Sequence, residues 1–221
     1  MQFDASNGWK EEIKPAGVLP PRSAGHSVIY DPDTSTLVVS FGLAAGPTLL
    51  DDQWILDFGE GVAGIWRCVE GTSPQCKAAR ADDVVSTEIR PARPSARAFA
   101  AGARVGLYQF LFGGLTGQPK QCAPGMTKQV LVGSDELWAM NVAYNIWFKV
   151  QQAGTTPWAR AFSQLASLNA SGGYTNPTLL IGGANTSCEL DEPPCSVWQP
   201  LNDVTFIRWA PCGLICGRSH R

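Results

Sequence analysis

Charged residues are scarce in this chain, at 16% of 221 residues, and the formal net charge is only −2. No basic stripe is visible, so the sequence gives no reason to expect a nucleic-acid partner. No apolar run approaches the ~20 residues that a membrane-spanning helix needs, and no membrane span is expected. Residues 1–6 lack a basic start and an apolar core, so no signal peptide is predicted there.

Histidine is also scarce, because the chain holds only His26 and His220. A transition-metal site usually needs several His or Cys ligands, and these two do not supply one. Cys212 and Cys216 have neither the spacing nor the second pair of a zinc site. No Gly-x-Ser-x-Gly motif is present, and a triad base would have to be one of the two histidines. We therefore expect no catalytic residue, no metal and no cofactor.

The chain is rich in turn residues, with 23 Gly and 16 Pro, and 44% of it is hydrophobic. Its apolar runs are short, contain aromatic or branched residues, and are bounded by Gly, Asn or Pro. Residues 97–150 contain four such runs, the pattern of successive antiparallel strands. A parallel sheet would need helical crossovers, for which this stretch has no room. The sequence therefore predicts an all-β fold.

Three ordered copies of one pattern run along the chain. Each copy has a Pro and an Arg, then a glycine mark, then an acidic-apolar phrase, then a Trp. The arginines are Arg22, Arg97 and Arg160; the glycine marks are Gly42, Gly113–Gly114 and Gly182–Gly183; the tryptophans are Trp66, Trp147 and Trp209. Repeats of this kind stack units that cannot bury their faces singly.

These marks resemble the kelch family of β-propellers, and the resemblance covers about residues 9–209. It implies four-stranded antiparallel blades at 21–70, 94–150 and 157–210, within a propeller segment of residues 1–211. Residues 1–13 would be the last strand of a blade, residues 212–221 a tail, and the strand at Trp9 would pair near Trp209. The recurring arginines would hold strand ends through backbone carbonyls, and acids such as Asp52 and Glu136 would have structural roles.

Three blades and a leading fragment fall short of the four to eight with which propellers close. We therefore expect an incomplete propeller, either part of a longer chain or a subunit of a larger assembly. The repeats also carry inserts at 71–93, 116–133 and 185–200, where the chain departs from the family. The first is predicted to be an ordered loop or a short helix.

The preferred function is a non-catalytic scaffold that binds protein partners through these inserts. Two tryptophans match no repeat mark and are candidate anchors, although packing beneath a loop is an equal interpretation. Polar candidates lie in the two later inserts. The alternative interpretation of the acidic segment in the last insert is a solvated loop without a partner. The candidate contact residues are Trp158, Trp198, Lys120, Glu189, Asp191 and Glu192.

Seven cysteines are present, and two pairs, Cys68 with Cys76 and Cys188 with Cys195, are close enough to form disulfides within their loops. Asn169 and Asn185 are formal N-glycosylation acceptors. Together these features favour a secreted or cell-surface location. The alternative is reduced thiols and unused acceptors. The odd count implies a cysteine that is free, intermolecular, or paired with a missing part of the chain.

Two other functions stay open at this point. Kelch-like propellers include enzymes, so the chain could belong to an oxidase-like or carbohydrate-binding propeller whose axial site is completed by missing blades. It could also be an architectural subunit of a large extracellular or ciliary assembly. The fold itself does not decide among these functions.

Overall fold

A computed structural model of the chain describes residues 3–4, 8–9, 14–46, 48–59, 63–80, 92–123, 126–168, 178–189 and 197–207. Apart from one short helix, its regular elements are strands, arranged in several antiparallel sheets that do not close on themselves. The predicted all-β class is confirmed. Within these residues, no helix has the length and apolar character needed to span a membrane.

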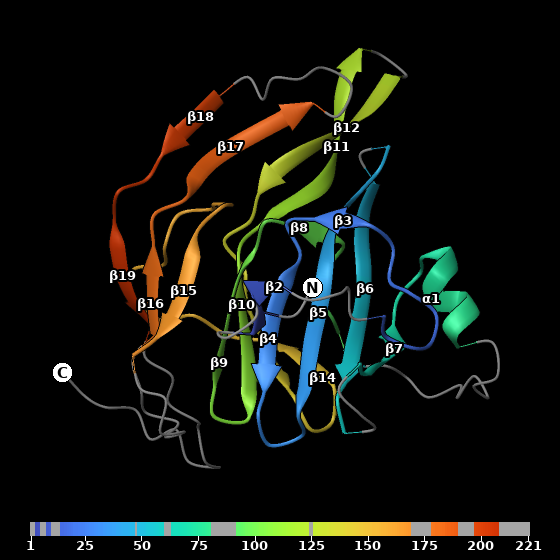
Figure 1. Cartoon of the computed structure of the whole chain (residues 1–221). Helices are drawn as coiled ribbons and strands as arrows, with labels where there is room; N and C mark the ends of the chain where they lie inside the picture. Colours follow the sequence, from blue (N-terminus) through green and yellow to red (C-terminus); the bar gives the residue numbers. More distant parts are fainter. Residues whose placement is uncertain are drawn as a thin grey trace.

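Three of the sheets are meanders that follow one another along the chain (Figure 1). The first sheet contains β3 (Ser23–Ala24), β4 (Ser27–Asp31), β5 (Thr36–Ala44), β6 (Thr48–Asp57) and β7 (Ile65–Glu70). The second contains β9 (Ala101–Val105), β10 (Tyr108–Phe112), β13 (Leu137–Asn141) and β14 (Ile146–Lys149). The third contains β15 (Gln164–Ser167), β16 (Thr178–Ile181) and β19 (Val204–Ile207).

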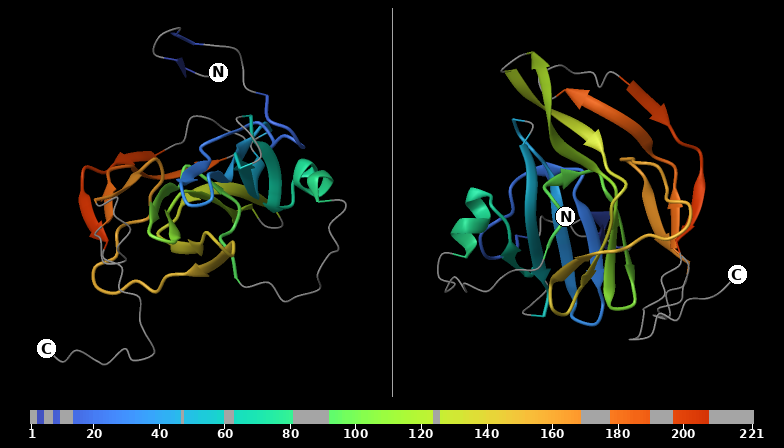
Figure 2. Two further views of the ribbon diagram at one scale, coloured as in Figure 1. Left: turned by 60° about the horizontal axis from the view of Figure 1, so that its bottom comes forward. Right: turned by 180° about the vertical axis from the view of Figure 1, so that it is seen from behind.

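The core lies between these sheets, because alternate residues of each strand point to opposite faces. Strand β4 lies against β9, and β9 lies against β15, so the first strands of the three sheets are neighbours. Figure 2 shows the same order from two other sides. One core cluster joins the first and second sheets and includes Ile29, Val38 and Leu111. Another joins the second and third sheets through Phe112 and Leu180.

A series of backbone hydrogen bonds links the three sheets. The amide of Phe99 donates to the carbonyl of Gly25 (2.6 Å), and the amide of Phe162 donates to the carbonyl of Phe99 (3.0 Å). All three residues have a positive φ, near 60°. A Cβ at Gly25 would lie 2.5 Å from the Phe99 ring, so this position requires glycine. The repeats are therefore fixed relative to one another by main-chain contacts.

The register corrects the sequence-based matching of the first copy. Ala24 lies opposite Leu43 in the same way that Ala98 lies opposite Leu115. Ser23, and not Arg22, therefore occupies the place of Arg97, and Arg22 is exposed.

The glycine mark of the first copy keeps its predicted alignment, with Phe41 at the place of Gly113 and Gly42 at the place of Gly114. Phe41 has a φ of 66°, close to the 69° of Gly113 and the 57° of Gly182. A phenylalanine thus occupies a left-handed backbone position that the other two copies give to glycine. Phe41 is tolerated there because its ring is buried and packs against Trp147, with ring centroids 5.7 Å apart.

The amino-terminal strands differ from the expectation. Strand β1 (Phe3–Asp4) pairs with β2 (Gly8–Trp9) in a separate two-stranded sheet. The pairing of the Trp9 strand with the third copy, predicted from the family resemblance, does not occur among the described residues. Strand β19 pairs there with β16 alone, and Trp209 and residues 212–221 lie outside the described part of the chain.

The first insert contains the short helix α1 (Pro74–Ala79), one of its two predicted forms, while residues 81–91 lie outside the described part. Ser73 caps the helix by accepting a hydrogen bond from the amide of Cys76. The predicted disulfide between Cys68 of β7 and Cys76 of α1 is present. Both half-cystines are buried with Trp54, so the disulfide fixes the helix against the first sheet.

Replacing both Cys68 and Cys76 with serine should lower the free energy of unfolding by about 2.5 kcal/mol, because the eight-residue loop is then open in the unfolded chain. Thermal denaturation followed by circular dichroism would measure the change. Reductant should lower the Tm of the wild-type protein more than that of the double variant. An equal response of both proteins would contradict the prediction.

Candidate functional site

The two later inserts form a sheet of their own, which we call the rim sheet. Its strands are β8 (Arg97–Ala98), β11 (Leu115–Ala123), β12 (Met126–Gly133), β17 (Ala184–Glu189) and β18 (Val197–Pro200), in the order β18-β17-β12-β11-β8. It rises above the ends of the three meanders (Figure 1). The inserts at 116–133 and 185–200 were predicted to be loops, so their formation of β-hairpins corrects that expectation.

The base of the rim sheet is apolar. Leu115 of β11 and Leu131 of β12 are buried together with Ala161, and Leu49 and Phe99 pack partly against them. Beyond this base the β11–β12 hairpin continues in regular register to Lys120, which lies opposite Lys128. Burial of the apolar base anchors this largely polar insert as a hairpin.

A second contact joins the inserts of two different repeats. Strand β12 pairs with β17 at three positions, from Val130 opposite Glu189 to Val132 opposite Ser187. The β17–β18 hairpin then adds the last strand, with Thr186 opposite Trp198. Residues about sixty positions apart in the sequence therefore share one continuous surface.

Arg97 anchors the rim sheet from below, with its side chain fully buried. Its guanidinium donates to the carbonyl of Gly113 (3.0 Å) and to the carboxylate of Glu136 (2.8 Å). Glu136 also accepts hydrogen bonds from the Trp138 indole (3.0 Å) and from the Lys149 ammonium (2.7 Å). The bond to Gly113 agrees with the backbone role that the resemblance implied for the arginine. The Glu136 carboxylate has a structural role, as expected, and accepts hydrogen bonds from three side-chain donors.

These contacts change the ionisation of both groups. Burial alone would raise the pKa of Glu136, but the hydrogen bonds from Arg97, Lys149 and Trp138 outweigh it and lower the pKa from 4.5 to about 2. Burial lowers the pKa of Arg97 from its ordinary value, against the opposing effect of Glu136. The pair is therefore fully charged at neutral pH.

Arg160 repeats this anchor in the third copy. Its guanidinium donates to the carbonyl of Gly182 (3.0 Å) and to both carboxylate oxygens of Asp203 (2.6 and 2.8 Å). These hydrogen bonds lower the pKa of Asp203. The backbone of Arg160 also bonds to Ser134 (2.9 Å) and Gly114 (2.8 Å), at the foot of the preceding insert. Arg160 thus connects the third repeat to the hairpin of the second.

In the first copy, the acid that corresponds to Glu136 and Asp203 is Asp52, and its hydrogen-bond donors are different. Its carboxylate accepts hydrogen bonds from the backbone amide of Ser73 (3.1 Å), from the Ser73 hydroxyl and from the Trp54 indole (3.2 Å). Ser73, the residue that caps α1, therefore supplies the hydrogen bonds that an arginine supplies in the other two copies. Arg93 adds an ion pair with Glu70 (2.9 Å) beside it. The structural role expected for Asp52 is present, with donors that the sequence did not indicate.

The rim sheet brings together part of the predicted contact set. Lys120 lies in β11, Glu189 ends β17, and Trp198 lies in β18. Trp158 stands apart from the rim sheet, in the segment that precedes Arg160, and is 66% exposed. Its carbonyl accepts a hydrogen bond from the Arg160 guanidinium (3.0 Å), which fixes the backbone beside the exposed ring.

Several other predictions fall partly outside the described residues. Asp191, Glu192 and the acceptor Asn169 lie outside them, as does Cys195 of the second predicted disulfide. Cys188 lies in β17, opposite Leu131. The other acceptor, Asn185, is half-buried in β17 opposite Gln199. Glycosylation and the second disulfide therefore stay predictions.

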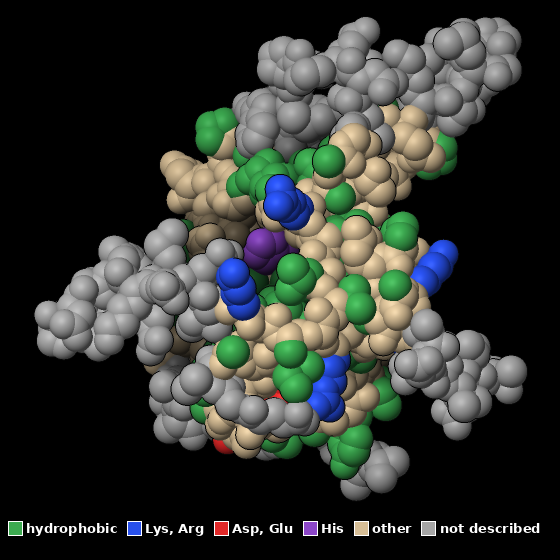
Figure 3. Space-filling view, turned by 45° about the vertical axis from the view of Figure 1, so that its right-hand side comes forward, with side chains coloured by type: hydrophobic (Ala, Val, Ile, Leu, Met, Phe, Trp, Pro, Cys, Tyr) green, Lys and Arg blue, Asp and Glu red, His purple; other side chains and the backbone are tan. Residues whose placement is uncertain are grey.

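Among the described residues, the charged side chains suggest no metal site. Within the described ranges, no group of three or more His, Cys, Asp and Glu residues is arranged to hold a metal ion. His26 is exposed, with its Nδ1 atom 3.5 Å from the Ser23 hydroxyl. On the face shown in Figure 3, the lysine and arginine side chains lie apart from one another. The described residues of that face form no continuous basic stripe.

Comparison with known proteins gives a limited result. No family description matches the chain, and no curated protein matches it. Among solved structures, 118 chains match, including one described as "Structure of YjhT", with 16% sequence identity and a TM-score of 0.45. That match covers 79% of this chain and 37% of the other, so this chain spans little more than a third of its length.

Proposed function

We propose that the chain is a segment of a kelch-type β-propeller and acts as a non-catalytic scaffold that binds a protein partner through its rim sheet. The repeat marks support the propeller assignment, as do the antiparallel meanders whose first strands lie side by side. The segment would be completed by further blades, in the same protein or in an assembly.

The observation that carries the binding role is the pairing of β12 with β17. It combines the inserts of two repeats into one ordered surface, while Arg97 and Arg160 fix its base. Binding residues held on strands are positioned more precisely than residues on free loops. A surface that is ordered before binding also loses less entropy on association, which favours affinity.

The register suggests the chemistry of the partner. Lys120 and Lys128 occupy directly opposed positions of the β11–β12 hairpin. Like charges at such positions destabilise a sheet. An acidic segment of the partner would offset this repulsion, so the far end of the hairpin would contact carboxylates.

The test removes the far end of this hairpin and leaves its base. In the variant, an Asn-Gly turn replaces residues 118–130, so that Gly117 remains opposite Leu131. Partners captured from extract by the wild-type chain would be identified and purified, and their binding to both proteins measured by calorimetry. We expect the variant to lose at least tenfold in affinity, as for the loss of a binding hot spot.

The matched control is Tyr144→Ala, in the turn at the opposite end of the strands, where the side chain is 74% exposed. It should bind as the wild-type chain does, and circular dichroism should show that all proteins are folded. Equal affinity of the hairpin variant would refute the proposed role of the rim sheet. Binding of a glycan or a metal by the full-length protein would support an axial site, and intermolecular disulfides would support an architectural subunit.

A further inference from the structure

The third sheet differs from the other two in its outer strand. Strand β14 pairs with β13 in the second sheet, and β7 pairs with β6 in the first. Among the described residues, no strand occupies this place beside β19, whose partner β16 lies on the other side. Among the described residues, the backbone groups along that edge of β19 thus have no partner strand, which is the arrangement that accepts an added strand.

In the first and second sheets, the outer strand contains a tryptophan. Trp147 of β14 lies opposite Met140 and is only 3% exposed. Its indole donates to the Gln53 side-chain oxygen across the boundary between the first and second sheets (2.9 Å). Trp66 of β7 lies in the same way opposite Leu56.

The register identifies the corresponding place in the third sheet. Thr178 occupies the position in β16 that Gln109 occupies in β10. Gln109 lies opposite Met140 and Thr178 lies opposite Ile207, so Ile207 corresponds to Met140. Ser40 lies opposite Gln53 as Phe112 lies opposite Leu137, so Leu137 corresponds to Gln53. A tryptophan that followed the pattern would lie between Leu137 and Ile207.

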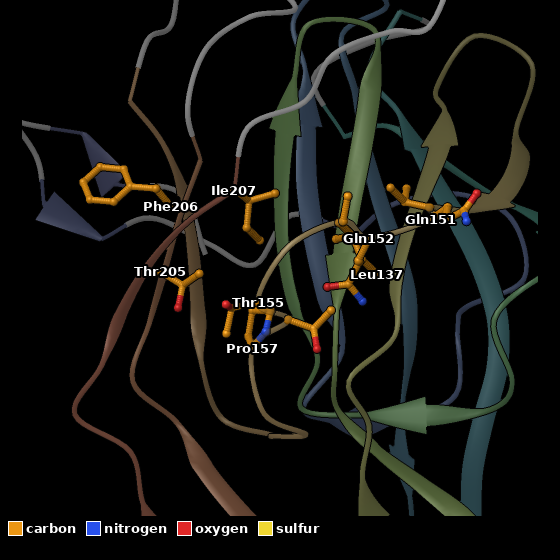
Figure 4. Close-up of a pocket in the computed structure, with 11 residues that line it drawn as sticks. Leu137, Gln151, Gln152, Thr155, Pro157, Thr205, Phe206 and Ile207 are labelled. Atoms are coloured by element: carbon orange, nitrogen blue, oxygen red, sulfur yellow. The ribbon is translucent and has the colours of Figure 1, made fainter. Parts of the chain in front are cut away.

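A cleft of about 300 Å³ lies at this position, between the second and third sheets. Figure 4 shows Leu137, Thr205 and Ile207 around it, while the Phe206 ring points away to the opposite face of β19. All eleven residues that line the cleft are uncharged. Its volume is at the lower end of the range found for ligand pockets, which suits a single ring system.

The cleft also offers hydrogen-bond acceptors. Gln151, Gln152 and Thr155 are among the residues that line it, and each of these side chains has an oxygen that can accept a hydrogen bond. The Gln152 amide nitrogen donates to the carbonyl of Asp135 (2.8 Å), which fixes that side chain. An indole N–H that enters the cleft could therefore find an acceptor, as Trp147 finds Gln53.

We propose that this cleft and the open edge of β19 together bind an extended peptide segment that carries a tryptophan. The segment adds an antiparallel strand to β19, and its indole enters the cleft opposite Ile207. Main-chain hydrogen bonds supply affinity and the indole supplies specificity, as in other cases of strand addition. The occupant is a tryptophan-bearing strand because that is what fills this position in the two neighbouring sheets. The site is separate from the rim sheet and goes beyond the proposed function.

The probe is a fluorescent peptide with the sequence of residues 144–151, because β14 fills the corresponding place in the second sheet. Its binding to the full chain would be measured by fluorescence anisotropy. The same peptide with alanine in place of Trp147 should bind at least tenfold more weakly. N-acetyltryptophanamide, which has the indole without a strand, should compete poorly.

Paired variants of β19 test the location of the site. Thr205→Lys places a charge at the cleft and should weaken peptide binding at least tenfold, because a charge is costly to bury unpaired. Val204→Lys changes a residue of the same strand that does not line the cleft, where the side chain is 55% exposed, and should leave binding unchanged. Thermal denaturation would establish that both variants are folded. The variant with the shortened rim hairpin should bind the peptide normally, so this result is independent of the proposed function.

Three results would overturn the proposal. Absence of saturable peptide binding to the full chain would mean that the edge accepts no added segment. Equal binding of the alanine peptide would show that the indole does not contribute to the interaction. Competition by N-acetyltryptophanamide at the same concentration as the peptide would identify a small-molecule pocket without strand addition.

Discussion

Replacing Arg97 with methionine is expected to lower the free energy of unfolding by about 3–5 kcal/mol, the usual effect of removing one partner from a buried ion pair. The guanidinium is fully buried and bonds both to the Gly113 carbonyl and to the Glu136 carboxylate. Methionine fills much of the same volume but cannot donate, so the Gly113 carbonyl loses this donor and Glu136 loses one of its three side-chain donors. Urea denaturation monitored by tryptophan fluorescence would measure the loss.

Arg97→Lys is the informative companion variant. It keeps the charge, but a single ammonium cannot reach Gly113 and Glu136 as the planar guanidinium does, so it should recover only part of the stability. If Arg97→Met lost less than about 1 kcal/mol, within the range of an exposed ion pair, the anchoring role would be wrong.

The same contacts predict an acid-sensitive fold. The pKa of Glu136 is about 2 in the folded chain and 4.5 without these contacts. The stability that its charge contributes is therefore fully present above about pH 4.5 and is lost as the pH falls towards 2. Asp203, whose pKa is also lowered, contributes in the same direction. Denaturation midpoints of the wild-type chain and Glu136→Gln should converge over this range, and parallel curves would contradict the assignment.

Trp147→Ala should also reduce the free energy of unfolding by about 3–5 kcal/mol, since it removes a large buried side chain. The indole is 3% exposed and fills the boundary between the first and second sheets. The substitution also leaves the Gln53 side-chain oxygen without its donor. Chemical denaturation would measure the change, and Trp147→Phe should lose less because it keeps most of the apolar contact.

Tyr144→Ala serves as the control for Trp147, because it lies three residues away and is 74% exposed. A surface substitution of this kind should change stability by no more than about 0.5 kcal/mol. If both alanine variants were equally stable, the sheets would not depend on the indole. The comparison also bears on the cleft beside β19, which lies where a third such tryptophan would be buried.

Much of the fold could be predicted from local sequence patterns. Short apolar runs gave strands such as β5 and β13, because alternation and bounding turn residues are properties of a few neighbouring positions. The spacing of Cys68 and Cys76 was sufficient to predict their disulfide. Trp54, Trp138 and Trp147 are buried, as expected for tryptophans that recur at the same place in repeated sheets.

The rim sheet could not be predicted in this way. Its β11–β12 hairpin contains Thr116, Gln118 and Lys120, which are typical of a solvated loop. What orders it is the pairing of Val130 to Val132 with Ser187 to Glu189, a contact between distant parts of the chain that has no local sequence pattern. Strand pairing depends on such tertiary context more than helix formation does.

The first copy was misaligned for a similar reason. Arg22 follows a proline and resembles the other arginines in sequence, yet the register places Ser23 at their position. The alignment is set by the left-handed residues Gly25, Phe99 and Phe162, and the first copy has glycine where the other two have phenylalanine. In the first copy the backbone conformation is repeated while the residue type is not, and sequence matching detects only residue type.

The pairing of β12 with β17 has a consequence for the evolution and engineering of this chain. A hairpin transplanted alone into another scaffold would lose its neighbouring strand and expose an unpaired edge. Changes in length or register in one insert would have to be matched in the other. The two inserts should therefore be exchanged as one cassette, and new recognition properties would have to be selected in both together.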